Sequence, residues 1–166
     1  MGPWSKRRSP WRPSGRTRRT GGKKGTKRSL LVDGNGIPLS LIVSGAHRHD
    51  VALLEPTLDR VVVRRPRGQA RQHLCGDKGY AGQPADQAVR ARRYVPHIPQ
   101  RGAHAAPKRR PRHARPRRWV VERTHSWLNR FRKLLVRFEK TTESYEGLLE
   151  LACALIAYRQ VITIYG

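Results

Sequence analysis

The sequence has few acidic residues, and it has none before Asp33. Asp and Glu together number 11 against 36 Lys and Arg, which leaves a formal net charge of +25 over 166 residues. Solubility does not require so large an excess of one sign, and such an excess is typical of a protein that binds a polyanion. Nucleic acid is therefore the first partner that the composition indicates.

Long apolar runs and metal-binding cysteine spacings are also missing. No apolar run approaches 20 residues, so we expect no membrane-spanning helix and no membrane partner. Cys75 and Cys153 form no Cys-x-x-Cys motif and the histidines are scattered, so neither a disulfide framework nor a zinc site is expected. The basic N-terminus lacks the apolar segment of a secretory signal. We expect two reduced core thiols in a cytosolic protein.

The first 22 residues are rich in Arg, Lys, Gly, Pro and Ser and show no hydrophobic periodicity. Burial of apolar surface cannot offset the entropy that such a segment would lose on ordering. We therefore expect residues 1–22 to be a disordered basic arm and residues 23–166 to form one domain. With 37% hydrophobic residues in the chain, its core should be modest.

Strand and helix signals alternate through the first half of this domain. Asp33-Gly34-Asn35-Gly36 separates two apolar runs and is typical of a tight hairpin turn. Asp50 is better suited to cap a following helix than to bind a metal. The alternation predicts an α/β fold. The expected elements are strands over 28–32 and 37–43, a helix over 50–58, a strand over 72–75, a helix over 85–93 and a strand over 94–98.

A basic, proline-containing loop is expected over residues 99–118, where Lys108, Arg109 and Arg110 would contact phosphates. Beyond it, apolar residues recur at spacings of four and three, which predicts a long helix. Thr142 is placed to cap a last helix, which we expect to pack antiparallel to the long one. The predicted buried stripe of the long helix consists of Val120, Thr124, Trp127, Phe131, Leu134 and Phe138.

Two isolated carboxylates stand in these basic surroundings. Asp77 follows the short strand over 72–75, and Glu122 lies near the start of the long helix, off its apolar stripe. Carboxylates brought together from a strand end and a helix can hold the divalent ions that promote phosphodiester cleavage. The alternative readings are a turn aspartate and an acid stabilised by the helix dipole. Spacing alone does not decide between them.

The face of the long helix that carries Glu122 is polar. His125, Asn129 and Lys133 follow Glu122 by three, seven and eleven positions, so an unbroken helix would place all four on one side. These groups are suited to contact a nucleic-acid strand.

Four motifs in this order resemble those of bacterial insertion-sequence transposases of the DDE class. The resemblance covers roughly residues 23–160, and its last two motifs are the most specific. The motifs are KGTKRSLLVDGNGIPL over 24–39, GAHRHD over 45–50, GDKGY over 76–80 and RWVVERTHSWLNRFR over 118–132.

The resemblance implies an RNase-H-like mixed sheet flanked by helices, with a C-terminal helix pair. It also implies DNA cut-and-paste chemistry that depends on Mg²⁺ or Mn²⁺, at the terminal inverted repeats of the element. By this resemblance Asp77 and Glu122 are catalytic, metal-binding carboxylates, and Arg123, Asn129 and Arg130 match positions that meet DNA. We expect a homodimer on DNA in the bacterial cytoplasm, at the nucleoid.

The family's first catalytic Asp lies on a strand ahead of the segment that matches residues 24–31. That stretch is here an acid-free leader, and neither Asp33 nor Asp50 matches the missing Asp. We therefore expect a domain that is incomplete at its first strand, from a truncated or frameshifted reading frame. Two functions stay open: a DDE transposase that cleaves and transfers DNA strands, impaired or inactive here, or a non-catalytic basic remnant that binds DNA or RNA.

Overall fold

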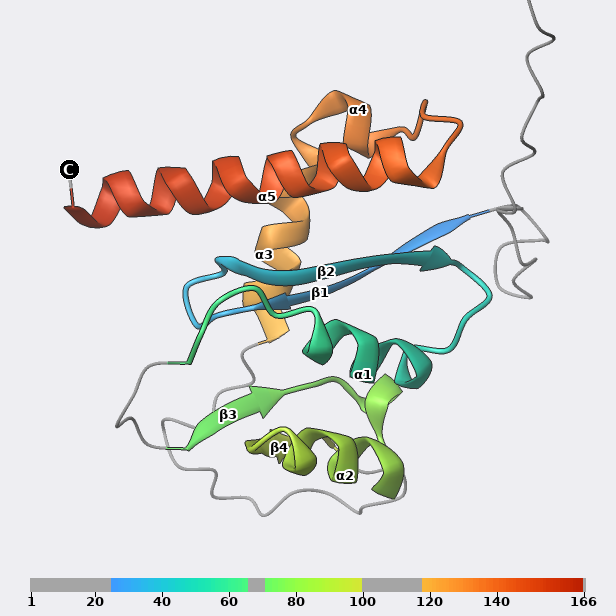
Figure 1. Ribbon diagram of the computed structural model, residues 1–166, viewed down its shortest axis with the longest axis vertical. Helices are drawn as coiled ribbons and strands as arrows, with labels where there is room; N and C mark the ends of the chain where they lie inside the picture. Colours follow the sequence, from blue (N-terminus) through green and yellow to red (C-terminus); the bar gives the residue numbers. More distant parts are fainter. Residues whose placement is uncertain (1–24, 66–70, 100–117, 166) are drawn as a thin grey trace, which may run out of the picture.

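A mixed α/β fold is seen in the computed structural model, which describes residues 25–65, 71–99 and 118–165 (Figure 1). The expected disordered arm lies outside the described residues, as do Lys108, Arg109 and Arg110. The described elements, in chain order, are β1 (Thr26–Val32), β2 (Pro38–Gly45), α1 (Val51–Asp59), β3 (Gln72–Cys75), the short 3-10 helix η2 (Lys78–Tyr80), α2 (Gln83–Ala91), β4 (Tyr94–His97), α3 (Arg118–Asn129), α4 (Arg132–Leu135) and α5 (Thr142–Tyr165).

The expected hairpin is confirmed, because β1 pairs with β2 in antiparallel register. The Asp33 side chain builds the turn: its Oδ1 accepts hydrogen bonds from the backbone N of Asn35 at 2.9 Å and of Ile37 at 2.8 Å. Gly36 adopts a φ of +86°, which residues with a Cβ rarely tolerate. Asp33 therefore serves the turn.

The expected single mixed sheet is not formed by the described residues. β1–β2 is an antiparallel pair, and β3–β4 is a separate parallel pair. A cavity of about 60 Å³ is lined by residues of β1, α1 and β3, among them Leu31, Leu58 and Leu74. In Figure 1 the β1–β2 hairpin lies above α1 and β3 lies below it.

The central hairpin separates two hydrophobic cores, because successive strand residues point to opposite faces. Leu31 packs toward the core below the hairpin in Figure 1, and Leu30 packs toward the core above it. The lower core contains Leu54, Leu58, Leu74, Ala85, Val89 and Ile98. The upper core contains Leu128, Leu134, Tyr145, Leu149, Ala152 and Ile156.

The prediction of one long helix from Trp119 onward is wrong in its second half. α3 ends at Asn129, Phe131 has an extended backbone, and α4 restarts as a short helix. The break turns Leu134 back into the upper core, where it is 2% exposed, whereas Phe138 is 71% exposed. Burial of Leu134 against α5 therefore overrides the continuous helical pattern.

The expected antiparallel pairing of the last two long helices is also wrong. Figure 1 shows α3 running crosswise to α5. α3 is anchored on the hairpin turn, where the buried Thr124 Oγ1 donates to the carbonyl of Gly36 at 2.7 Å, while α5 packs on β2. The two anchors hold the helices in different directions. No helix in the described part of the chain is long and apolar enough to span a membrane.

Two predicted caps and one predicted core thiol need correction. Asp50 precedes α1, but it makes no side-chain cap bond, because its backbone is already helical at φ −58° and ψ −40°. Thr141 replaces Thr142 as the cap of α5, accepting a hydrogen bond from the backbone N of Ser144 at 3.2 Å. Cys75 is exposed, and Cys153 is half-buried.

Candidate functional site

Asp77 lies directly after β3, as the sequence predicts. The backbone N of Gly76 donates to the carbonyl of His97 at 3.2 Å, which continues the parallel pairing up to the residue before Asp77. Asp77 Oδ1 then accepts a hydrogen bond from the backbone N of Gly79 at 2.8 Å. The turn therefore fixes one oxygen of an otherwise exposed carboxylate.

The acid that the fold brings next to Asp77 is Asp50. A methyl group placed on Gly79 would lie 2.9 Å from Asp77 Oδ1 and 3.3 Å from Asp50 Oδ2. The two oxygens thus flank the same point and can be no farther apart than the sum of those distances. We call Asp50 and Asp77 the acid pair.

A lysine and a tyrosine adjoin the acid pair. Lys27 Nζ lies 2.9 Å from Asp50 Oδ1 and also donates to the carbonyl of Arg48 at 2.8 Å. Burial raises the pKa of the Tyr80 hydroxyl, and the charges of Asp50 and Asp77 raise it further against an opposing hydrogen bond with Ser29. Tyr80 is therefore a neutral hydroxyl beside the carboxylates at physiological pH.

The donor chemistry of the acid pair fits a hard divalent cation. Mg²⁺ is commonly held by one or two carboxylates together with water and substrate phosphate. Lys27, at 2.9 Å from Asp50 Oδ1, offsets the negative charge of Asp50. The pair therefore fits one ion, bound by few protein ligands.

Glu122 is exposed on α3, as the fifth residue of that helix. Across residues 25–65, 71–99 and 118–165, no three His, Cys, Asp or Glu side chains are close enough to hold a metal ion. Glu122 therefore does not complete a three-ligand cluster with the acid pair. A metal shared by Asp77 and Glu122 stays a prediction.

Arg123 is occupied by contacts within the chain. Its guanidinium carbon lies 4.7 Å from the Trp119 ring centroid and 4.9 Å from that of Trp127, and it donates to the carbonyl of Asn35. These contacts join α3 to the hairpin turn. The described geometry thus gives Arg123 a packing role, and its DNA contact stays a prediction.

The other three described candidates for DNA contact differ in their surroundings. Asn129 Oδ1 accepts a hydrogen bond from Arg28 at 3.1 Å, while Arg130 and Lys133 are exposed. Because α3 ends at Asn129, Lys133 no longer continues the polar face of Glu122.

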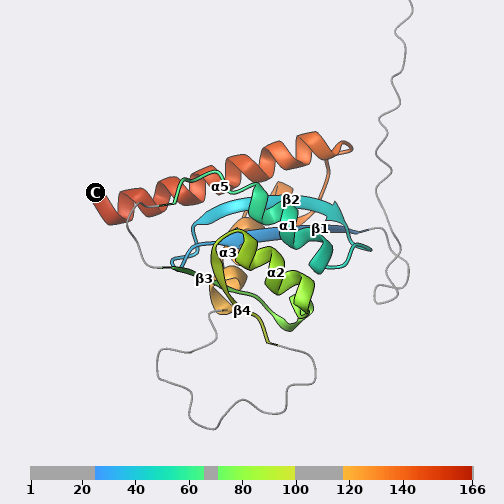
Figure 2. The same ribbon diagram turned by 60° about the horizontal axis from the view of Figure 1, so that its bottom comes forward.

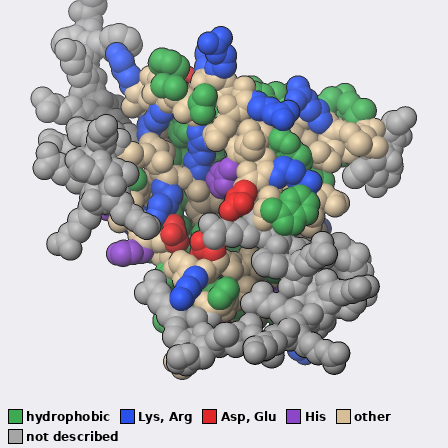
Figure 3. Space-filling model, turned by 180° about the vertical axis from the view of Figure 1, so that it is seen from behind, with side chains coloured by type: hydrophobic (Ala, Val, Ile, Leu, Met, Phe, Trp, Pro, Cys, Tyr) green, Lys and Arg blue, Asp and Glu red, His purple; other side chains and the backbone are tan. Residues whose placement is uncertain are grey.

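Figure 3 shows acidic side chains close together in the middle of a face where Lys and Arg side chains surround them.

Sequence reasoning missed Asp50 as a neighbour of Asp77, and it missed Lys27 and Arg28. All three lie within the first two motifs, so their presence was visible although their spatial roles were not. Asp50 and Asp77 are separated by α1 and β3 along the chain, and only the tertiary fold brings them together.

Residues 74–159, which include Asp77 and Glu122, match the family model described as Transposase DDE domain. A protein described as a transposase for insertion sequence element IS402, from Burkholderia cepacia, is 35% identical over 162 residues, which cover 93% of this chain and 71% of the relative. The chain belongs to the DDE transposases of bacterial insertion sequences. No solved structure gives a significant match.

The match to the Burkholderia cepacia transposase reaches beyond the domain that the motifs outlined. The alignment covers 93% of this DDE transposase, which is more than residues 23–166 alone can supply. The aligned region therefore includes part of residues 1–22. Membership of the family connects the chain to DNA transposition, to the ends of an insertion element and to divalent metal ions in general terms.

Proposed function

We propose that this chain is a DNA-binding transposase domain for metal-dependent strand cleavage and transfer at terminal inverted repeats, impaired by an incomplete set of acids. The observation that carries the proposal is the position of Asp77, fixed by Gly79 and placed beside Asp50 at the end of β3. The net charge of +25 supplies the attraction for DNA.

In this proposal Asp77 and Glu122 are the catalytic carboxylates, and Asp50 stands beside Asp77 as a further oxygen donor. A bound Mg²⁺ or Mn²⁺ would stabilise charge on the attacking and leaving oxygens of the phosphodiester. Asp77 offers an oriented carboxylate because one of its oxygens is held by the Gly79 amide. Lys27 balances the charge of Asp50.

We further propose that the fold is RNase-H-like and incomplete at its first strand. The antiparallel pair β1–β2 and the parallel pair β3–β4 would form one mixed sheet if a further strand lay between β1 and β3, both of which contribute to the lining of one small cavity. A strand paired with both edges would join them. The cavity of about 60 Å³ is much smaller than a strand, so β1 and β3 would have to move apart to admit one.

Two assays test the proposed function. Isothermal titration with Mn²⁺ should show binding by the full chain that is lost in Asp77→Ala and retained in Glu143→Ala, which removes an exposed carboxylate at the start of α5. Labelled terminal-repeat DNA with Mg²⁺ or Mn²⁺ should be bound but cleaved and transferred little or not at all. Robust cleavage that disappears in Asp77→Ala would refute the impairment.

A non-catalytic nucleic-acid-binding remnant is the second candidate, favoured by the missing third ligand among the described residues. It predicts salt-sensitive DNA binding that is unchanged in Asp77→Ala and Glu122→Ala, together with no Mn²⁺ binding by the parent chain. A preference for structured RNA over duplex DNA would point to an RNA-binding remnant instead.

A further inference from the structure

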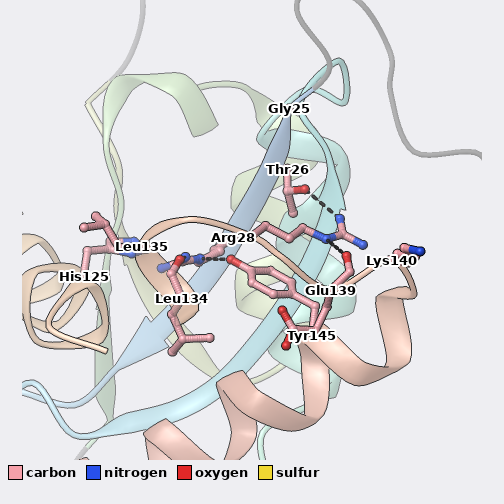
Figure 4. A pocket seen from close by; sticks show the side chains of 10 residues that line it. Gly25, Thr26, Arg28, His125, Leu134, Leu135, Glu139, Lys140 and Tyr145 are labelled. Carbon is pink, nitrogen blue, oxygen red and sulfur yellow. Dashed lines mark hydrogen bonds between the residues drawn. The ribbon is translucent and has the colours of Figure 1, made fainter. Parts of the chain in front are cut away.

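A cavity of about 660 Å³ opens between β1, α3, α4 and the first turn of α5, away from the acid pair (Figure 4). Its lining is dominated by ionisable and hydrogen-bonding side chains from segments far apart in the sequence. We call it the basic pocket, and the residues that matter are Arg28, His125, Arg137, Glu139, Lys140 and Tyr145.

Tyr145 organises two of the cations. It is 2% exposed, and its hydroxyl accepts a hydrogen bond from Arg28 Nε at 2.8 Å. The guanidinium carbons of Arg28 and Arg137 lie 5.6 Å and 5.0 Å from the centroid of its ring. Figure 4 shows Arg28 and Tyr145 pointing toward each other. One buried ring therefore gathers two positive charges.

Further hydrogen bonds fix both guanidinium groups. Arg28 also donates to Asn129 Oδ1 at 3.1 Å and to the carbonyl of Leu134. Arg137 donates to Thr26 Oγ1 at 2.8 Å and to the carbonyl of Glu139 at 3.2 Å. Because these side chains are already ordered, a ligand would not have to meet the entropy cost of arranging them.

The charge of the lining favours an anion. Arg28, Arg137 and Lys140 carry three positive charges, and Glu139 is the single acid among the described residues of the lining. Burial lowers the pKa of His125, and the positive charge of Arg28 lowers it further. His125 is thus a neutral imidazole in a region of positive potential.

The position of the pocket relates it to Glu122. His125 follows Glu122 by three residues on α3, so the two lie on one side of the helix, about one turn apart. The next turn carries Asn129, which holds Arg28. A DNA strand that passes Glu122 would therefore meet the pocket within a short length of backbone.

We propose that the basic pocket binds a backbone phosphate of the DNA strand whose neighbouring segment lies at Glu122. The bound phosphate contacts Arg28 and Lys140, and Arg137 and Tyr145 hold the pocket in shape. This inference rests on the proposed DNA-binding function, but it names a site that the catalytic carboxylates do not define.

The first test compares Lys140→Ala with Arg90→Ala. Both positions are exposed and each change removes one positive charge, but Arg90 lies on α2, outside the pocket. Fluorescence anisotropy of labelled terminal-repeat duplex would be recorded from low to high salt. Losing one phosphate contact should weaken binding by about 3- to 10-fold and reduce the slope of log affinity against log salt by about one in Lys140→Ala alone. Equal effects of the two substitutions would overturn the proposal.

The second test observes His125 by NMR in the full chain. An anion in the pocket should raise the pKa of His125, because it offsets the charge of Arg28. The duplex should produce this rise in the parent chain and a smaller one in Lys140→Ala. An unchanged His125 titration at saturating duplex would contradict the proposal, even if inorganic phosphate raised the pKa of His125. If the parent chain binds no DNA, the proposed function fails; if DNA binds without moving His125, only the pocket proposal fails.

Discussion

The acid pair and the basic pocket are built in opposite ways. Asp77 is exposed, and Asp50 is joined to its surroundings by a partly exposed ion pair with Lys27. In the basic pocket, Arg28 and Arg137 are held by several hydrogen bonds around a buried Tyr145. Exposed ion pairs contribute little to stability, whereas buried aromatic packing contributes much. Loss of the buried Tyr145 should therefore destabilise the domain, whereas substitutions at the acid pair should change its chemistry alone.

The largest expected effect is that of Tyr145→Ala. Removing a buried aromatic ring should lower the free energy of unfolding by about 3–5 kcal/mol, because it leaves a cavity and releases two guanidinium groups. Urea unfolding measures this change. Tyr158→Ala is the matched control on α5: Tyr158 is 62% exposed, and its loss should cost less than about 0.5 kcal/mol. Similar decreases in the free energy of unfolding of the two variants would show that the ring of Tyr145 stabilises the domain no more than an exposed ring does.

A smaller effect of opposite sign is expected for Gly147→Ala on α5. No atom lies within 4 Å of the position that its new methyl group would take. Alanine should raise the free energy of unfolding by roughly 0.5–1 kcal/mol, because it favours the helix over the unfolded chain. A decrease on urea unfolding would show that the surface of α5 at Gly147 is packed.

Gly79→Ala should barely change stability but should disturb the acid pair. The methyl group would lie 2.9 Å from Asp77 Oδ1, and the exposed carboxylate can rotate away at little cost. The displaced oxygen should bind Mn²⁺ about 10-fold more weakly in a calorimetric titration. Unaltered Mn²⁺ affinity would exclude the acid pair as the binding site.

The smallest effect concerns pH. Because the pKa of His125 is lowered in the folded state, the unfolded chain takes up the proton first as pH falls. The stability due to neutral His125 is therefore complete above the ordinary pKa of 6.5 and is lost as pH falls toward the lowered value. The charged groups around it in the pocket are Arg28, Arg137, Glu139 and Lys140.

His125→Asn should remove this part of the pH dependence. Urea unfolding of both proteins at about pH 7.5 and about pH 5 measures the difference. The parent chain should lose more stability than the variant between the two values. Equal losses would place the acid sensitivity elsewhere.

The sequence alone predicted elements whose cause is local. Asp33 and Gly36 fix the hairpin turn through their own side chain and backbone, and the short strand before Gly76 delivers Asp77 where expected. The motifs also led to the family, which the comparisons confirm. The conformation of a turn and the order of motifs depend on residues that are close together in the sequence, so both can be predicted without the tertiary structure.

Features decided by tertiary contacts could not be predicted in this way. The helical periodicity runs through Phe131, but burial of Leu134 beside α5 breaks the helix there. Arg123 has the sequence position of a DNA contact, yet two tryptophans and the hairpin turn engage it. The acid pair depends on how α1 and β3 come together, which no spacing between residues 50 and 77 reveals.

The difference between the two thiols allows a probe to be attached selectively near the acid pair. Burial and the charge of Glu150 raise the pKa of Cys153 to about 11, so little of it is thiolate at neutral pH, whereas Cys75 is exposed two residues before Asp77. A maleimide fluorophore should therefore attach to Cys75 in preference to Cys153. Paramagnetic quenching of that dye by Mn²⁺ would then report how near the ion settles to the end of β3.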